Sequence, residues 1–225
     1  MMIYLLLVLA VLLSFVVVLI VKPKSQANIK LALAFSGAFL LAITFFELVP
    51  EVYAEGNLKV NALFILIGVL LQVFLEFFSK GAEHGHMHWQ LDRNQFPTVL
   101  FLSLSLHALI EGVPVAEANS NILFGILVHK IPIAIILSIF LVNSKLNPWL
   151  CMLFMTLFAL MTPLGKYLAT ETAFISDYKT QLNALAVGVF LHISTVILFE
   201  SAREHTFDLK KLIGIISGFG IAYFL

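Results

Sequence analysis

Two histidines, a glutamate and a lysine lie within apolar stretches of this sequence. His107 and Glu111 are four residues apart, and His129 and Lys130 follow in the next apolar stretch. Ionisable side chains are costly in hydrocarbon and usually mark the path of an ion or substrate. Two imidazoles and one carboxylate suit a borderline divalent ion, Zn²⁺ first, with Fe²⁺ or Mn²⁺ as further candidates. We therefore predict a metal site formed by His107, Glu111 and His129.

The composition predicts that this site lies in a membrane. Of the 225 residues, 61% are hydrophobic and 12% are charged, and the mean hydropathy is +1.03. A soluble domain of this length needs more polar surface, so we expect an integral membrane protein in contact with a lipid bilayer. Basic residues are few and flank the apolar stretches, which argues against nucleic-acid binding. The lone Cys151 cannot form an internal disulfide.

Eight apolar segments are visible, most of them close to the ~20 residues that a helix needs to cross the hydrocarbon core. The first lacks the basic start and the small-residue cleavage site of a signal peptide, so we interpret it as a retained helix. We predict an all-α, polytopic membrane protein with eight transmembrane helices and a single transporter domain over residues 1–225. The predicted helices span residues 3–21, 31–50, 60–79, 97–116, 121–142, 148–168, 182–201 and 209–225.

The charges in the connecting loops predict the orientation. Alternate loops, beginning with the first, carry nine basic residues, whereas the other loops carry three. Basic loops stay in the cytoplasm, so both termini are predicted to lie outside, with a His-containing cytoplasmic loop at 80–96. The nine are Lys22, Lys24, Lys30, Lys80, Arg93, Lys145, Arg203, Lys210 and Lys211, and the three are Lys59, Lys166 and Lys179.

A short internal similarity indicates how the helices are related. GAFLLAIT at residues 37–44 and GVFLHIST at residues 188–195 share four of eight positions. These segments cross in opposite directions, as in an inverted-topology repeat, although chance similarity between Leu/Phe-rich helices explains the match equally well. The repeat hypothesis gives a 3+2+3 bundle, in which the two central helices carry the metal site.

Helix geometry brings the candidate ligands to one depth. His107 and Glu111 stack on one helix face because they are four residues apart. At ~1.5 Å per residue, His107 lies ~15 Å from the inner surface and His129 ~12 Å from the outer surface. In a hydrocarbon core of ~30 Å they can meet near the midplane. Pro114 and Pro132 are predicted to expose carbonyls within these helices, which a wet pathway would tolerate.

With these residues in view, the chain resembles the ZIP (Zrt/Irt-like) family of divalent-metal transporters over nearly its whole length. The resemblance lies in the helix count, the orientation, the cytoplasmic His loop and three motifs. The motifs are ELVPE at Glu47–Glu51, HxxxEG at His107, Glu111 and Gly112, and HKxxxA at His129, Lys130 and Ala134. The resemblance implies that His107, Glu111 and His129 are ligands of a central transport site and that no prosthetic group is needed.

The sequence also departs from family members that have a binuclear centre. Ala108, Lys130 and Ile133 stand where those members carry further ligands, and Phe39 stands where some have a ligand in the second helix. The resemblance therefore implies a single metal at a time, in the branch of the family that has the HK pair. Lys130 either pairs with a buried carboxylate such as Glu111, replacing a second cation, or is solvated in a vestibule.

Further candidates lie above and below the predicted site. Glu47 is a candidate entrance residue, and His192 is a candidate ligand, a proton relay or simply a histidine satisfied between helices. Glu76 and Glu200, near the cytoplasmic helix ends, are candidates for an exit. A metal-capturing role is predicted for the histidines of the cytoplasmic loop, with an ordinary solvated loop as the alternative. They are His84, His86 and His88.

We predict a transporter, not an enzyme, that moves zinc, or else Fe²⁺, Mn²⁺ or Cd²⁺, into the cytoplasm by alternating access. A bacterial inner (cell) membrane is predicted from the compact loops, and a homodimer is left open. One alternative is a membrane-embedded zinc hydrolase, in which the metal activates water; the lack of Asp within the predicted helices argues against it. The other is a metal-blind structural relative of a transporter.

Overall fold

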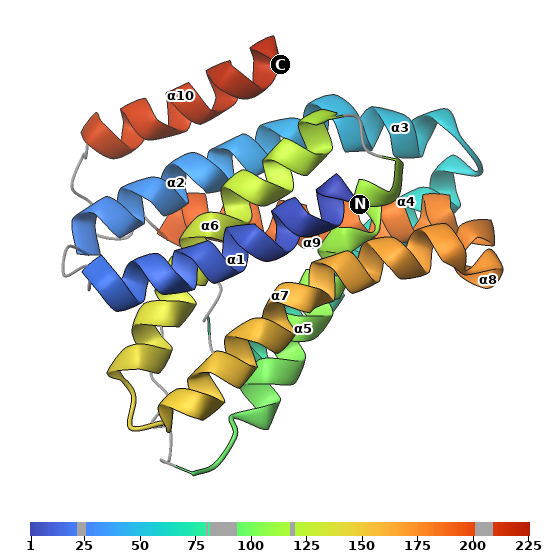
Figure 1. The fold of residues 1–225 in the computed structure, drawn as a ribbon. Helices are drawn as coiled ribbons and strands as arrows, with labels where there is room; N and C mark the ends of the chain where they lie inside the picture. The colour runs from blue at the N-terminus through green and yellow to red at the C-terminus, as the bar shows by residue number, and fades with distance from the viewer. Residues whose placement is uncertain (22–25, 80, 82–93, 118–119, 201–208) are drawn as a thin grey trace.

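The structure is a computed structural model of the chain and describes residues 1–21, 26–79, 81, 94–117, 120–200 and 209–225. All regular secondary structure in these ranges is helical (Figure 1). In chain order the helices are α1 (Met2–Val21), α2 (Gln26–Ile43), a π-helical turn (Thr44–Leu48), α3 (Val49–Ala54), α4 (Leu58–Ser79), α5 (Thr98–Gly112), a 3₁₀ turn (Pro114–Glu117), α6 (Ser120–Asn143), α7 (Pro148–Glu171), α8 (Ala173–Asp177), α9 (Lys179–Glu200) and α10 (Leu209–Phe224).

The prediction of an all-α, polytopic membrane protein is confirmed. Within the described ranges, six stretches are long and apolar enough to cross a membrane, and α5 is a shorter apolar helix. Their outer faces carry large apolar side chains such as Leu70 and Phe74 of α4 and Ile216 of α10, which are more than half exposed. Several polar side chains, in contrast, are buried, among them Ser138 and Thr162. This inverted distribution is the one expected when lipid, rather than water, surrounds the helices.

The second apolar segment is longer than predicted. Helical structure continues from α2 through the π-helical turn into α3, so one apolar stretch runs from Asn28 to Ala54. Pro50 does not end it, and stands in the first turn of α3, directly after the π-helical turn. The extra residue of a π turn shifts the helix face locally, a feature that is frequent at functional sites.

The fourth predicted segment is shorter than predicted, and the expectation for Pro114 was wrong. α5 ends at Gly112, and Pro114 begins the 3₁₀ turn that follows instead of lying inside the helix. A proline cannot donate to the carbonyl four residues earlier, so the α-helical pattern stops before it. Val113 closes the end by donating to the carbonyl of Ile110 at 3.1 Å. Pro132, in contrast, does lie inside α6.

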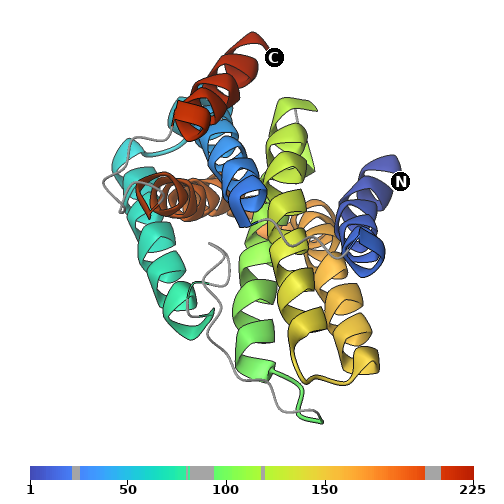
Figure 2. The ribbon, with the colours of Figure 1, turned by 90° about the vertical axis from the view of Figure 1, so that its left-hand side faces the viewer.

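The helices pack in two groups, which lie on the left and right of Figure 2. In the first group α4 packs along α9, and α2 packs against both α10 and α9. In the second group α5 packs along α7, and α1 packs against both α6 and α7. The groups meet mainly where α2 contacts α6 and where α4 contacts α5.

The packing partners bear on the hypothesis of an inverted repeat. A 3+2+3 repeat exchanges α1 with α7, α2 with α9, α4 with α10 and α5 with α6. Under this exchange the α2–α10 contact becomes α9–α4, and the α1–α6 contact becomes α7–α5; all four contacts are present. In Figure 1, α1 begins and α10 ends on the side where α3 and α8 lie, so both termini lie toward one side. The number of crossings and the orientation stay predictions.

Two pairs of glycines allow the closest helix approaches. A Cβ on Gly68 would lie 2.1 Å from the Leu185 carbonyl, and one on Gly188 2.0 Å from the Ile65 carbonyl. Gly112 and Gly165 form the crossing of α5 and α7 in the same way. A Cβ on Gly112 would lie 2.2 Å from the Thr162 carbonyl, and one on Gly165 would lie 1.9 Å from the Leu109 carbonyl. Small residues at such crossings allow close backbone packing in membranes. Gly112 directly follows Glu111, so α7 packs against α5 next to this candidate ligand.

Candidate metal centre

Two neighbouring helices bring the three predicted ligands together. His107 and Glu111 come from α5 and His129 from α6, and their candidate ligand atoms all lie within 4.8 Å of one another. All three side chains are buried, with exposures of 1%, 1% and 0%. Within the described ranges, this is the only group of three or more His, Cys, Asp or Glu side chains close enough to hold one metal ion.

The Glu111 carboxylate is the centre of this cluster. Its Oε1 atom lies 2.9 Å from Nε2 of His107 and 3.9 Å from Nε2 of His129. The short distance follows from the four-residue spacing on one helix face. One carboxylate oxygen therefore faces two imidazole nitrogens, which is a donor set that Zn²⁺ accepts.

Lys130 contacts the other oxygen of the same carboxylate. Its Nζ donates to Glu111 Oε2 at 2.5 Å, and the lysine side chain is only 2% exposed. The ammonium also lies 5.3 Å from the ring centroid of Phe158 in α7, within the range of a cation–π contact. Two predictions were made for Lys130. The structure confirms that it pairs with Glu111, and the prediction of a lysine solvated in a vestibule is wrong.

The two carboxylate oxygens are consequently in different surroundings. Oε2 is held by an ammonium, whereas Oε1 faces only imidazoles. A buried ion pair needs close geometry and further hydrogen bonds to offset the loss of hydration. A divalent ion could bind at Oε1 without displacing Lys130 from Oε2. The arrangement can hold one such ion with two nitrogen donors and one oxygen donor.

Three of the four positions at which the sequence departs from a binuclear centre are apolar and buried; the fourth is Lys130. Ala108 is 0% exposed and Ile133 is 3% exposed, and both belong to helices of the centre. Phe39 of α2 is 2% exposed and stacks on Phe35. None of these three side chains offers a metal-ligating atom, so a second ion would receive no ligand from them.

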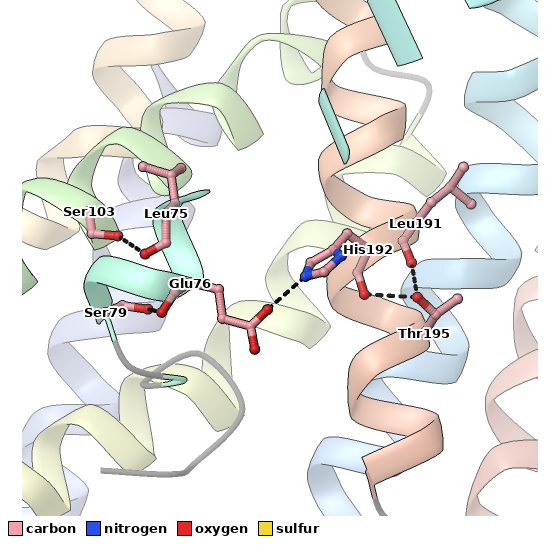
Figure 3. Close-up of polar contacts among 7 residues, drawn as sticks. All are labelled: Leu75, Glu76, Ser79, Ser103, Leu191, His192 and Thr195. Atoms are coloured by element: carbon pink, nitrogen blue, oxygen red, sulfur yellow. Dashed lines mark hydrogen bonds and ion pairs between the residues drawn. The ribbon is translucent and has the colours of Figure 1, made fainter. Parts of the chain in front are cut away.

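The remaining candidates lie apart from this cluster. Glu47, in the π-helical turn, accepts a hydrogen bond from Asn121 Nδ2 at 3.0 Å, at the beginning of α6. His192 of α9 contacts Glu76 of α4 at 2.7 Å, as Figure 3 shows, and is not part of the central group. Glu200 is the last residue of α9. The predictions for His84, His86 and His88 fall outside the described residues.

Sequence reasoning missed two buried polar side chains. Gln72 of α4 is 0% exposed, and Lys166 of α7 is 8% exposed. Lys166 Nζ donates at 3.0 Å to the carbonyl of Val115, in the turn that follows α5. Both residues stand as single polar letters in apolar runs. The same pattern, a single polar residue among apolar ones, marks His107 in the sequence.

The fold and the cluster define a class, a helical membrane protein with a buried His/Glu cluster that could hold a metal ion, and comparisons with known proteins narrow it. The family model described as "ZIP Zinc transporter" matches residues 83–225. "Zinc transporter ZIP1" of Danio rerio is 33% identical over 183 residues, which cover 76% of this chain and 56% of that protein. "Zinc transporter ZIP1" of Takifugu rubripes is 30% identical over 150 residues, covering 62% and 50%. "Protein zntD" of Dictyostelium discoideum is 27% identical over 147 residues, covering 56% and 22%.

The chain belongs to the ZIP zinc transporter family, because the family model matches more than half of it. The match includes α5 and α6 and so contains the whole central cluster. The chain spans about half the length of the two fish proteins. The resemblance drawn from the motifs of the sequence is therefore confirmed at the level of the family.

Proposed function

We propose that this chain transports divalent metal ions, zinc foremost, across the membrane into the cytoplasm, and that it is not an enzyme. The observation that carries the proposal is the convergence of His107, Glu111 and His129, all buried, within 4.8 Å. Membership in a family of zinc transporters supports the same reading. A closed structural zinc site has four protein ligands, whereas three ligands leave a position for water and allow exchange.

Lys130 gives the empty site a balanced charge. The Lys130 ammonium offsets the charge of the Glu111 carboxylate within the cluster. Binding of a divalent ion adds two positive charges to a buried site, which opposes tight retention. The centre is thus suited to binding an ion briefly and then releasing it. Zinc is proposed ahead of Fe²⁺, Mn²⁺ or Cd²⁺ because imidazoles make up two of the three donors.

The two helix groups provide a basis for alternating access. His107, Glu111, His129 and Lys130 all belong to the group of α1, α5, α6 and α7. Movement of that group against α2, α4, α9 and α10 would carry the complete site without breaking its ligand set. Alternating access in transporters with inverted repeats is largely a rigid-body motion of this kind. Glu47, beside Asn121, is proposed to attract cations at the outer side.

Transport by purified chain in zinc-loaded liposomes tests the proposal. Wild type should release zinc above the background of protein-free liposomes, and His107→Ala combined with Glu111→Ala should reduce the rate to that background. Leu106→Ala is the matched control, because Leu106 neighbours His107 in α5 but is 42% exposed on the outer face. Transport at the full wild-type rate by the double variant would overturn the proposal. Repeating the assay with Fe²⁺, Mn²⁺ and Cd²⁺ gives the selectivity.

The cellular setting is part of the same proposal. The short connections between most helices fit a bacterial inner (cell) membrane, and fractionation of the native host checks this placement. A homodimer is compatible with the apolar outer faces of the helices, and cross-linking in native membranes measures it. Detection only as a monomer would contradict the dimer and leave the transport proposal intact.

A further inference from the structure

A second pair of ionisable side chains joins the other helix group. Glu76 of α4 and His192 of α9 meet with their side chains 2.7 Å apart (Figure 3). The imidazole is 15% exposed and the carboxylate 29%, so both are more accessible than the central ligands. The pair has the donor types of the central centre, an imidazole nitrogen and a carboxylate oxygen.

A buried amide lies on the same face of α4. Gly68, Gln72 and Glu76 follow one another at four-residue intervals, so they form one stripe along the helix. Both ends of the stripe face α9, because Gly68 contacts Gly188 and Glu76 contacts His192. Gln72 lies between these two contacts, on the side of α4 that packs against α9.

Gln72 is the unexplained member of this stripe. It is 0% exposed, and neither its Oε1 nor its Nε2 atom has a hydrogen-bond partner among the described residues. A buried polar group without a partner costs about 1–3 kcal/mol. An apolar side chain at this position would avoid that cost, so the amide is explained if a ligand satisfies it. Its oxygen would be the third donor beside Glu76 and His192.

A hydrogen bond between the helix groups connects this region to the central centre. Ser103 of α5 donates to the carbonyl of Leu75 in α4 at 2.6 Å, and both residues are drawn in Figure 3. Ser103 is one helical turn before His107, and Leu75 is the residue before Glu76. The stripe on α4 is therefore adjacent to the inner flank of the central cluster in the predicted orientation.

We propose that Gln72, Glu76 and His192 form a second divalent-metal site, which receives the ion released from the central centre. The proposal rests on the function proposed above. An imidazole, a carboxylate and a carboxamide oxygen suit the same borderline ions, with water completing the shell on the exposed side. The ion would then pass from a mobile ligand set on α5 and α6 to a receiving set on α4 and α9. The greater exposure of Glu76 and His192 favours release.

Zinc binding to the full chain in lipid nanodiscs, measured by titration calorimetry, tests this site directly. His84, His86 and His88 are replaced by Ala in every variant, so that the cytoplasmic loop cannot contribute. His107→Ala with His129→Ala removes the central centre, and one zinc ion per chain should still bind. Adding His192→Ala should then weaken this binding by about tenfold or more, since even outer-shell partners of a metal contribute that much.

Two further variants separate a ligand role from a structural one. Gln72→Leu should weaken the remaining zinc binding and at the same time raise the melting temperature, because it removes the unpaired amide. Thr195→Val is the control, since the Thr195 hydroxyl bonds only to the carbonyls of Leu191 and His192 in its own helix, at 2.7 and 2.9 Å. It should leave binding unchanged. The proposal would be overturned if the chain bound no zinc once His107 and His129 were replaced. It would also be overturned if zinc bound equally well with and without His192.

Transport with the central centre intact gives an independent readout. His192→Ala should lower the maximal rate while leaving the half-saturating zinc concentration near that of wild type, because the central ligands still set the uptake affinity. An unchanged maximal rate would overturn the receiving role. If wild-type protein transported no metal in liposomes, the proposed function would fail. Calorimetry would still detect zinc binding at the second site, so the two failures can be told apart.

Discussion

Two carboxylates of this protein, Glu111 and Glu76, show how burial changes what an ionisable group requires. Glu111 is 1% exposed and has an ammonium at 2.5 Å and two imidazoles at 2.9 and 3.9 Å. Glu76 is 29% exposed and has one imidazole at 2.7 Å. A carboxylate without water needs its charge matched by protein, whereas a partly wet one does not. The central helices consequently carry a fully buried cluster, whereas the pair between α4 and α9 is partly exposed.

Replacing the two carboxylates should give the largest contrast. Glu111→Gln leaves the Lys130 ammonium buried without its counter-ion, which should cost about 3–5 kcal/mol of unfolding free energy. Glu76→Gln removes a partly exposed pair and should cost about 1 kcal/mol or less. Steric-trapping measurements of unfolding in bicelles give both values. Equal costs would show that burial does not distinguish the two regions.

Removing the ammonium instead of the carboxylate sharpens the comparison. Lys130→Met leaves Glu111 as an unmatched buried anion in the metal-free protein, which should cost about 3 kcal/mol. Zinc supplies the missing charge, so saturating zinc should raise the melting temperature of this variant more than that of wild type. Lys166→Met is the matched control, because Lys166 bonds to the Val115 carbonyl rather than to a carboxylate. A similar zinc-induced shift in both variants would contradict the role of Lys130.

The two glycine crossings offer a comparison of packing rather than charge. A Cβ on Gly165 would lie 1.9 Å from the Leu109 carbonyl, and one on Gly188 2.0 Å from the Ile65 carbonyl. Each Gly→Ala change should therefore cost about 1–3 kcal/mol through overpacking. Only Gly165→Ala should also weaken zinc binding at the central centre, because it displaces α5 next to Glu111. Gly220→Ala is the control, since nothing lies within 4 Å of the added Cβ.

The smallest expected effect is at the bond between the two regions. Ser103→Ala removes a single hydrogen bond to the Leu75 carbonyl, and such interhelical bonds in membrane proteins average about 0.6 kcal/mol. The thermal midpoint should fall slightly, with zinc affinity at the central centre unchanged. Ser138→Ala is the comparison, because the Ser138 hydroxyl donates to the Ala134 carbonyl within α6. It shows how much stability is lost when a hydroxyl is removed without breaking a bond between helices. A large loss of stability would mean that this contact holds the groups together.

Much of the fold was predictable because hydrocarbon limits the alternatives. A spanning chain must satisfy its backbone internally, so long apolar runs can only be helices. Hydropathy predicted eight of them, and six stretches in the described ranges are long and apolar enough to cross a membrane. The ends were less predictable: α5 stops before Pro114, while the helical stretch of α2 and α3 continues past Pro50. Pro114 follows the end of α5 and Pro50 stands in the first turn of α3, whereas Pro132 lies inside α6. Proline by itself therefore does not fix where a helix of this protein ends.

The candidate ligands were also visible in the sequence, for a reason that does not extend to their partners. His107 and Glu111 share a helix, so their spacing alone places them together, and the rarity of charge in apolar runs identified His129. The pairing of His192 with Glu76 joins residues 116 positions apart and has no local signature. Gln72 carries no charge, so hydropathy alone did not single it out.

By itself the sequence determined a helical membrane protein with His107, Glu111 and His129 inside it, because hydrophobic period and rare buried charge are local properties. Tertiary structure alone decided between the two readings of Lys130, since a salt bridge to Glu111 depends on how α5 and α6 lie side by side. It also decided which glycines meet and that Glu76 faces His192. These are contacts between distant segments, and only the packing of whole helices sets their distances.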